Sequence, residues 1–315
     1  MKMVKDPLSE LLDRAGVRGA VFSRAELGAP WGLSTTGSLG GPIRPAIFHV
    51  AIRGGGFIQV EDDEPQAWRA GDVMIMPHGD AHVMRSELGI PATPISVLPA
   101  PLGDDGLPCV SHGGDGPRTS VLCGTFHFTP EAADLLRPQL PPLLHLRCAE
   151  GPTAAWLDST LRLLGAEAAS GLPGSETVVA RLADVLFVQA LRMWIRDAPE
   201  AETGWLSALA DPQLARVLGL IHAEPSAPWT AASLARKAGM SRSALYTRFT
   251  ERVGETPAAY LTRWRMHVAT RELVKGASLA SVAAEVGYSS EAAFSRAFKR
   301  AKGTSPGAWR AKACA

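Results

Sequence analysis

The apolar positions along this chain of 315 residues follow two different periods, and the change falls just after Pro142. Before it, apolar residues come in short runs separated by glycine and proline, which is typical of β-strands joined by turns. Strands are predicted over residues 46–52, 73–76 and 121–128, and the glycine- and proline-rich stretch 99–118 is predicted to be a loop. Short strands at close spacing predict a small barrel or sandwich.

After Pro142 the apolar residues recur at the 3.6-residue spacing of helices. Two helices are predicted over residues 154–169 and 176–195, and both are apolar over more than one narrow stripe. Either they pack on the barrel, or they form the seam of a homodimer. The dimer is favoured, because a helix pair between two domains has little else to cover it. Asp211 and Pro212 then open another helix, as N-cap and first-turn proline.

The composition is that of an ordinary folded protein, with 46% apolar and 20% charged residues. It excludes wholesale disorder and a collagen-like repeat. No window of about 18 residues is uninterruptedly apolar, so no membrane partner is expected, and the N-terminus lacks the apolar run of a secretory signal. The four cysteines are sparse and irregularly spaced, which favours a cytoplasmic location.

The net charge of +1 conceals a strong division of charge along the chain. After Ala235 there are 15 basic and 5 acidic residues, a net charge of +10, whereas the preceding part has 17 basic and 26 acidic residues, a net charge of −9. A compact basic region on an acidic body indicates a polyanionic partner for the C-terminal part alone.

That basic region contains a segment that occurs twice. Gly239-Met240-Ser241 in the first copy corresponds to Gly287-Tyr288-Ser289 in the second, at an offset of 48 residues. After the serine the offset becomes 49, because the second copy has one additional residue following its turn. In each copy an apolar helix ends at a glycine and a serine caps the next helix, which is the pattern of a helix-turn-helix unit.

The second helix of such a unit lies in the major groove of double-stranded DNA, so its outer face is predicted to contact DNA. Leu245 and Phe249 point inward in the first copy, as do Phe294 and Phe298 in the second. Arg296 best matches the guanine edge, and Glu291 suits a cytosine amino group. Arg248 and Lys299 are expected at phosphates. The full predicted DNA-binding set is Arg242, Ser243, Tyr246, Thr247, Arg248, Ser290, Glu291, Ser295, Arg296 and Lys299.

Residues 211–313 resemble the DNA-binding domain of AraC/XylS-type transcription regulators. The resemblance rests on WTAASLARKAGMSRSALYTRFTERVGETPAAYL followed by SLASVAAEVGYSSEAAFSRAFKRAKGTSPGAWR, which match that family in order and spacing. It implies recognition of promoter DNA through the second helix of each unit. It also implies that the other domain senses an effector or mediates dimerisation.

The N-terminal region resembles cupins, which are small β-barrels that often hold a metal. Residues 71–82 fit the second cupin signature, a glycine, five residues, a proline, one residue, a glycine, two residues and a histidine. The resemblance implies that His82 stands at a ligand position, while His49 is the one histidine in the strand corresponding to the first signature. His49 and His82 are therefore candidates for a small-molecule effector pocket. With Cys123, and with His127 or His112 as alternatives, they are also candidate ligands of a divalent metal such as zinc. A third interpretation makes them hydrogen-bonded core residues.

Together these features predict an α+β protein of several domains. A cupin-like sensor domain is expected over residues 1–150, a helical linker or dimerisation region over 151–205, and an all-α DNA-binding domain over 211–313 with helix-turn-helix units at about 231–252 and 279–301. The favoured function is a homodimeric, effector-responsive transcription regulator without catalytic activity. The alternative is a metal-dependent cupin enzyme fused to a DNA-binding tail.

Overall fold

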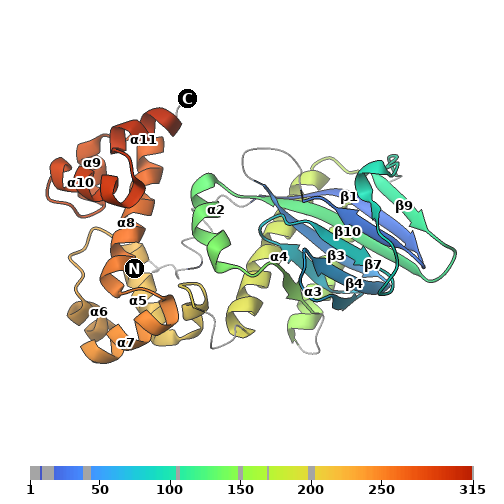
Figure 1. Ribbon diagram of the computed structural model, residues 1–315, viewed down its shortest axis with the longest axis horizontal. Coiled ribbons are helices and arrows are strands. Elements are labelled where there is room, and N and C mark those ends of the chain that lie inside the picture. The colour runs from blue at the N-terminus through green and yellow to red at the C-terminus, as the bar shows by residue number, and fades with distance from the viewer. Residues whose placement is uncertain are drawn as a thin grey trace. The chain divides into compact units, whose positions relative to one another are not determined.

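The computed structural model describes Leu8 and residues 18–37, 44–103, 107–147, 152–168, 170–197 and 203–313. Two of the four cysteines, Cys148 and Cys314, lie outside these ranges. The chain divides into a compact unit over Gly16–Trp194 and a second compact unit that contains Ile195–Ala315 (Figure 1). None of the described helices is both long and apolar enough to cross a membrane.

Two β-sheets make up most of the first unit. The six-stranded sheet has the order β11-β6-β3-β10-β1-β9 and the five-stranded sheet the order β5-β4-β7-β2-β8. Their bounds are β1 (Arg18–Gly28), β2 (Gly32–Thr35), β3 (Ala46–Arg53), β4 (Gly55–Val60), β5 (Gln66–Arg69), β6 (Val73–Met76), β7 (His82–Arg85), β8 (Thr93–Pro94), β9 (Cys109–Gly113), β10 (Arg118–His127) and β11 (Leu144–Leu146). Short helical segments accompany them, namely η1 (Ile95–Val97), α2 (Pro130–Leu136) and η2 (Arg137–Gln139).

The inner faces of both sheets share one hydrophobic core. Alternate residues of β3 and β10, such as Ile47 and Val121, meet Ile58 and Met84 from the five-stranded sheet in this cluster. Successive side chains of a strand point to opposite faces, so the intervening residues of β3 and β10 face outward. Residues 46–51 are nevertheless all buried, which means that the outer face of β3 is covered as well.

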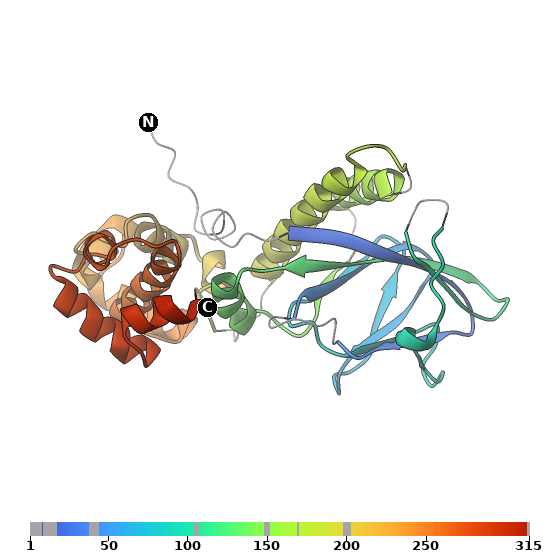
Figure 2. The ribbon, with the colours of Figure 1, turned by 90° about the horizontal axis from the view of Figure 1, so that it is seen from above.

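Helices α3 (Pro152–Ala168) and α4 (Ser175–Asp197) provide that cover (Figure 2). Phe187 of α4 lies with its ring 5.0 Å from the ring of Phe126, which in turn lies 4.6 Å from Phe48. The carboxylate of Asp184 accepts a hydrogen bond from the Gly19 amide of β1 at 2.8 Å. The predicted division at residue 150 therefore separates elements that pack together, because these helices cover a sheet face that would otherwise be exposed.

Gly124 of β10 shows how closely this outer layer is packed. A Cβ atom at this position would lie 2.2 Å from Cζ of Phe48 and 2.4 Å from the carbonyl oxygen of Ala20. Only glycine leaves room for the Phe48 ring on the sheet.

The strands predicted over 46–52, 73–76 and 121–128 correspond to β3, β6 and β10. The loop predicted over 99–118 is wrong in part, because it contains β9, which pairs in parallel with β1. The residues of β9 alternate weakly in hydropathy, and the strand is held by backbone hydrogen bonds at the edge of its sheet, so the sequence pattern carries little signal for it.

The second unit is helical. Its elements are η3 (Ser207–Ala210), α5 (Pro212–Ala223), α6 (Ala231–Ala238), α7 (Arg242–Val253), α8 (Pro257–Val274), α9 (Leu279–Glu285), α10 (Glu291–Lys302) and α11 (Pro306–Ala313). Helix α8 runs between the α6–α7 pair and the α9–α10 pair (Figure 1). These pairs coincide with the two helix-turn-helix units that the repeat predicts.

Candidate nucleic-acid interface and barrel site

The first helix-turn-helix unit is built by local signals. Thr230 caps α6 in a reciprocal capping box with Ser233, and the helix ends at Gly239, whose φ of 69° is left-handed. Ser241 then caps α7 by accepting a hydrogen bond from the Ala244 amide at 3.1 Å. A glycine takes this left-handed conformation without the steric cost of a side chain, so the chain can turn here from one helix to the next.

Helix α7 separates its residues into two faces. Leu245 and Phe249 are fully buried against the rest of the unit. Four of the predicted DNA-binding residues are exposed, Arg242, Ser243, Tyr246 and Thr247. Tyr246 keeps 52% of its surface exposed, so its ring and hydroxyl are accessible to a partner molecule.

Arg248 does not lie on that outer face as a free cation. Its guanidinium pairs with the carboxylate of Asp211 and donates a second hydrogen bond to Oε1 of Gln213 at 2.7 Å. The expectation that Arg248 contacts phosphate assumed an unpaired side chain. Sequence position does not reveal this ion pair, because Asp211 stands 37 residues earlier.

The second helix-turn-helix unit repeats the arrangement of the first with one difference. Phe294 and Phe298 of α10 are buried, while Glu291, Arg296 and Lys299 are exposed and Ser295 is half-buried. The cap of α10 is Ser290, which accepts a hydrogen bond from the Ala293 amide at 3.2 Å, and this places the cap one residue beyond the predicted serine. The additional residue of the second copy accounts for this shift. The Ser290 hydroxyl therefore already has a structural role at the helix end.

Helix α8 and the residues around it hold the two units together. The ring of Trp264 stacks at 3.7 Å on that of His222 from α5, and His222 Nε2 lies 2.7 Å from the hydroxyl of Tyr260. Arg265 donates hydrogen bonds to the carbonyl groups of Pro225 and Ala227, at 2.7 and 3.0 Å. A side chain at Gly287, in the turn of the second unit, would contact Arg265 and Ser226 at under 3.0 Å. Sequence reasoning missed these supports, because each joins segments far apart in the chain.

In the barrel, the three predicted site residues do come together. His49 of β3 and His82 of β7 approach with their Nε2 atoms 2.8 Å apart, and His49 Nδ1 lies 3.1 Å from Sγ of Cys123 on β10. All three side chains are buried. His82 Nδ1 also lies 3.0 Å from the carbonyl oxygen of Asp80.

The positions of the protons along this series of hydrogen bonds follow from its end at the Asp80 carbonyl. A backbone carbonyl only accepts, so His82 Nδ1 carries a hydrogen and donates it to Asp80. Burial lowers the pKa of His82 and lowers the pKa of His49 well below 6.5, with His82 contributing to the second shift, so both rings are neutral near pH 7. The bare Nε2 of His82 therefore accepts from His49 Nε2–H, and the bare Nδ1 of His49 accepts from the thiol of Cys123. Burial raises the pKa of that thiol to about 12, which keeps it protonated.

This geometry does not fit the predicted metal site. Cys123 and His82 lie at opposite nitrogens of the His49 ring, whereas a zinc ion needs its ligand atoms around one point. Neither alternative ligand joins them, since His127 is exposed and pairs with Thr125 at 3.1 Å, and His112 lies on the edge strand β9. No group of three or more metal-ligating residues suited to an ion occurs among the described residues. The structure thus places His49 and His82 in a hydrogen-bonded chain.

Two tryptophans in the same core are buried without a hydrogen-bond acceptor among the described residues. Trp31 and Trp68 are 1% and 4% exposed, and their ring centroids lie 6.2 Å apart. Neither indole Nε1–H finds an acceptor among the described residues. Because a buried N–H group without an acceptor is costly, this pair is a place where an incoming acceptor atom is favoured.

Comparison with known proteins agrees with the division of the chain into a β-rich unit and a helical unit. Residues 6–196 match the cupin family model, and residues 234–312 match a helix-turn-helix domain model. The chain is 34% identical to an AraC-like transcription regulator of Streptomyces lividans, over 97% of this chain and 98% of the relative. It is 32% identical to the transcriptional regulator AlkR of Acinetobacter baylyi, over 82% of this chain and 86% of the relative.

Among solved structures, the DNA-binding domain of AdpA in complex with a target DNA is 31% identical over 32% of this chain and 92% of that chain, with a TM-score of 0.31. The full-length relatives are transcription regulators rather than enzymes, which sets aside the alternative of a metal-dependent enzyme.

Proposed function

The chain belongs to the AraC-like transcription regulators, and from this premise we propose that it reads promoter DNA through α7 and α10 in response to a small molecule received by the barrel. The observation that carries the proposal is the separation of faces on both helices. Each buries two large apolar residues and turns basic and polar side chains outward, Arg242 and Tyr246 on α7 and Arg296 and Lys299 on α10. None of these outward cations forms an ion pair with a described residue.

The test is selection of bound sequences from random duplex DNA with the full-length protein. Wild type is expected to enrich half-sites that each contain two blocks of fixed bases about one helical turn apart, one block for each helix-turn-helix unit. Arg242→Ala is expected to relax one block and Arg296→Ala the other. Arg53→Ala at the end of β3, where the side chain is exposed and lies outside α3 and α4, is the matched control and should leave both blocks unchanged. Equal weakening on all sequences would contradict base reading by these arginines.

We propose further that the effector enters the core near His49 and His82. The two histidines already satisfy each other, whereas the indole groups of Trp31 and Trp68 have donors to offer and both histidines are uncharged near neutral pH. This combination favours an uncharged molecule with hydrogen-bond acceptors over an anion, because a buried anion would lack a compensating charge.

A thermal-shift screen of neutral carbonyl compounds against matched carboxylates tests this idea. Trp31→Phe and Trp68→Phe keep the ring and remove the N–H group, so each is expected to weaken a hit by roughly 2- to 10-fold. Trp229→Phe in the other unit is the control. Carboxylate ligands that bind wild type and both variants with the same affinity would refute the proposal.

We also propose that the protein acts as a homodimer through α3 and α4. Val178 and Val185 are 40% and 43% exposed and lie two turns apart on α4, and Leu163 of α3 is 52% exposed. Sedimentation analysis should give a dimer for wild type and a monomer for the double variant Val178→Asp/Val185→Asp. Leu88→Asp, an equally drastic change at an exposed leucine of the barrel unit, should remain dimeric.

A further inference from the structure

The segment that precedes the first helix-turn-helix unit lies along its recognition helix. The amide of Gly204 donates a hydrogen bond at 2.8 Å to the carbonyl of Arg252, in the last turn of α7. Trp205 and Leu206 follow and are buried. The segment then reaches Asp211, which begins α5, so the same stretch of chain contacts α7 at its C-terminal end and again near its middle.

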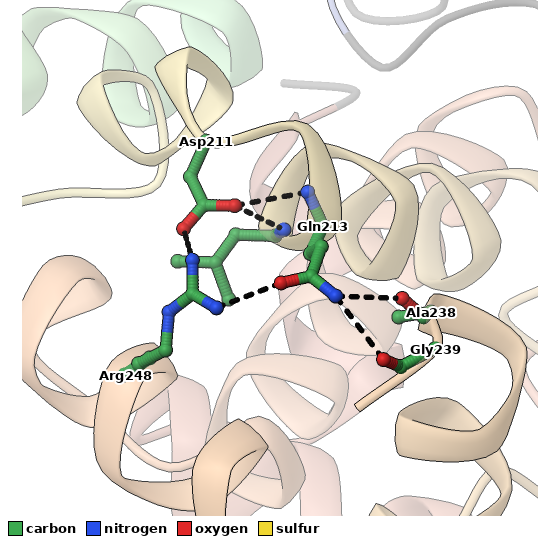
Figure 3. Close-up of polar contacts among 6 residues, drawn as sticks. Asp211, Gln213, Ala238, Gly239 and Arg248 are labelled. Atoms are coloured by element: carbon green, nitrogen blue, oxygen red, sulfur yellow. Dashed lines mark hydrogen bonds and ion pairs between the residues drawn. The ribbon is translucent and has the colours of Figure 1, made fainter. Parts of the chain in front are cut away.

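Asp211 has two functions at once. Its Oδ1 atom caps α5 by accepting hydrogen bonds from the amides of Gln213 and Leu214, at 2.9 and 3.2 Å. Its Oδ2 atom pairs with the guanidinium of Arg248 (Figure 3). The carboxylate is mostly buried, with 14% of the side chain exposed, so the ion pair is partly shielded from solvent.

Gln213 connects the recognition helix to the turn. Its Oε1 atom accepts from Arg248 at 2.7 Å, and its Nε2 atom donates to the carbonyl groups of Ala238 and Gly239, at 3.3 and 3.2 Å (Figure 3). The orientation of the amide is determined by these neighbours, because the guanidinium only donates and the carbonyls only accept. One side chain thus fixes where α6 ends relative to the middle of α7.

Among the described residues, the second helix-turn-helix unit forms no counterpart of this arrangement. At the repeat offset of 49 residues, Arg248 corresponds to Ala297, which is buried and carries no polar group. Near the turn of the second helix-turn-helix unit, Arg265 instead donates to the carbonyls of Pro225 and Ala227, and its guanidinium lies 5.9 Å from the centre of the Tyr288 ring. The contacts of Asp211 and Gln213 therefore bear on the first unit specifically.

We propose that Asp211 and Gln213 are positioning residues that set the orientation of α7 for base reading, and that Arg248 is the tie through which they act rather than a phosphate contact. The inference rests on the proposed reading of DNA by α7. The distinction matters physically, because a phosphate contact adds affinity for every sequence, whereas a helix held in register adds discrimination between sequences.

Three variants remove the tie at different atoms. Asp211→Asn keeps an oxygen to cap α5 and loses the ion pair. Gln213→Ala removes the link to the turn, and Arg248→Lys keeps the charge but not the fork that reaches both partners. All three are expected to lower the preference for the selected site over scrambled DNA roughly 10-fold, at the bases read by α7 only. The bases read by α10 and the salt dependence of affinity should stay as in wild type.

The measurements are binding selection and fluorescence anisotropy over a salt series, with the full-length protein and thermal unfolding to verify folding. If Arg248 contacts phosphate, Arg248→Ala weakens all sequences equally and reduces the slope of log affinity against log salt by about 1, while Gln213→Ala has no effect. That result would overturn the inference.

Arg242→Ala separates this failure from failure of the proposed function. If it relaxes the α7 bases and the Asp211 and Gln213 variants do not, the positioning role is wrong and α7 reading stands. If neither Arg242→Ala nor the Asp211 and Gln213 variants change the base preference, the positioning role and base reading by α7 are both wrong.

Discussion

Protonation of the buried histidine pair should destabilise the barrel in mild acid. In the unfolded chain His49 and His82 titrate near pH 6.5, whereas burial lowers the pKa of each in the folded protein. The unfolded chain therefore binds more protons than the folded chain below that pH. The stability contributed by the neutral pair is complete above about pH 6.5 and is lost as the pH falls.

The size of the effect follows from proton linkage. A histidine that titrates at 6.5 when unfolded and stays neutral when folded costs about 1 kcal/mol between pH 6.5 and 5.5. Two such residues give up to about 2 kcal/mol, a large part of the stability of an ordinary domain. Moreover, a protonated His49 no longer accepts from Cys123, so the hydrogen-bonded chain cannot stay intact.

Urea unfolding of the full chain measures this dependence at pH 7.5, 6.5 and 5.5. The quantity compared is the free energy of the transition in which the barrel unfolds. His82→Gln should lose about half of it, since the amide can still pair with His49 without titrating. His127→Gln, at an exposed histidine of the same unit, is the control and should behave as wild type. A wild-type barrel equally stable at pH 7.5 and 5.5, or an unchanged slope in His82→Gln, would refute the assignment of a neutral buried pair.

Three further outcomes are expected. Arg296→Ala should cost about 1–3 kcal/mol of binding to the selected DNA and relax one base pair, measured by anisotropy on single-base variants, and a uniform loss would argue for a phosphate contact. Affinity for DNA should fall steeply between 50 and about 200 mM salt, and a flat response would contradict binding by the basic outer faces. Gly124→Ala should destabilise the barrel by about 1–3 kcal/mol in urea unfolding because its Cβ would overlap the Phe48 ring, whereas Gly165→Ala, with open space around it, should not.

Much of the DNA-binding unit could be predicted because its signals are local. Caps such as Thr230 and Ser278, the left-handed Gly239 and the buried spacing of Leu245 and Phe249 act over three or four residues, so sequence position alone reveals them. The repeat then showed that the pattern occurs twice, and the charge division showed which part faces a polyanion. In the second copy the N-cap is Ser290, one residue later than the serine that the repeat predicts, because the additional residue follows the turn.

Tertiary structure decided what depends on distant segments meeting. The sequence indicates His49, His82 and Cys123 as candidate site residues. Their separations of 33 and 74 residues leave open whether they converge on an ion or form a chain of hydrogen bonds. The pairing of the strands places them in the chain of hydrogen bonds. Likewise Arg248 reads from sequence as a free cation until the fold brings Asp211 beside it. Local propensity determines helices, caps and faces, because those interactions lie within a turn or two. Which polar groups partner one another is determined by packing, because a buried donor or charge must find its complement wherever the fold supplies it.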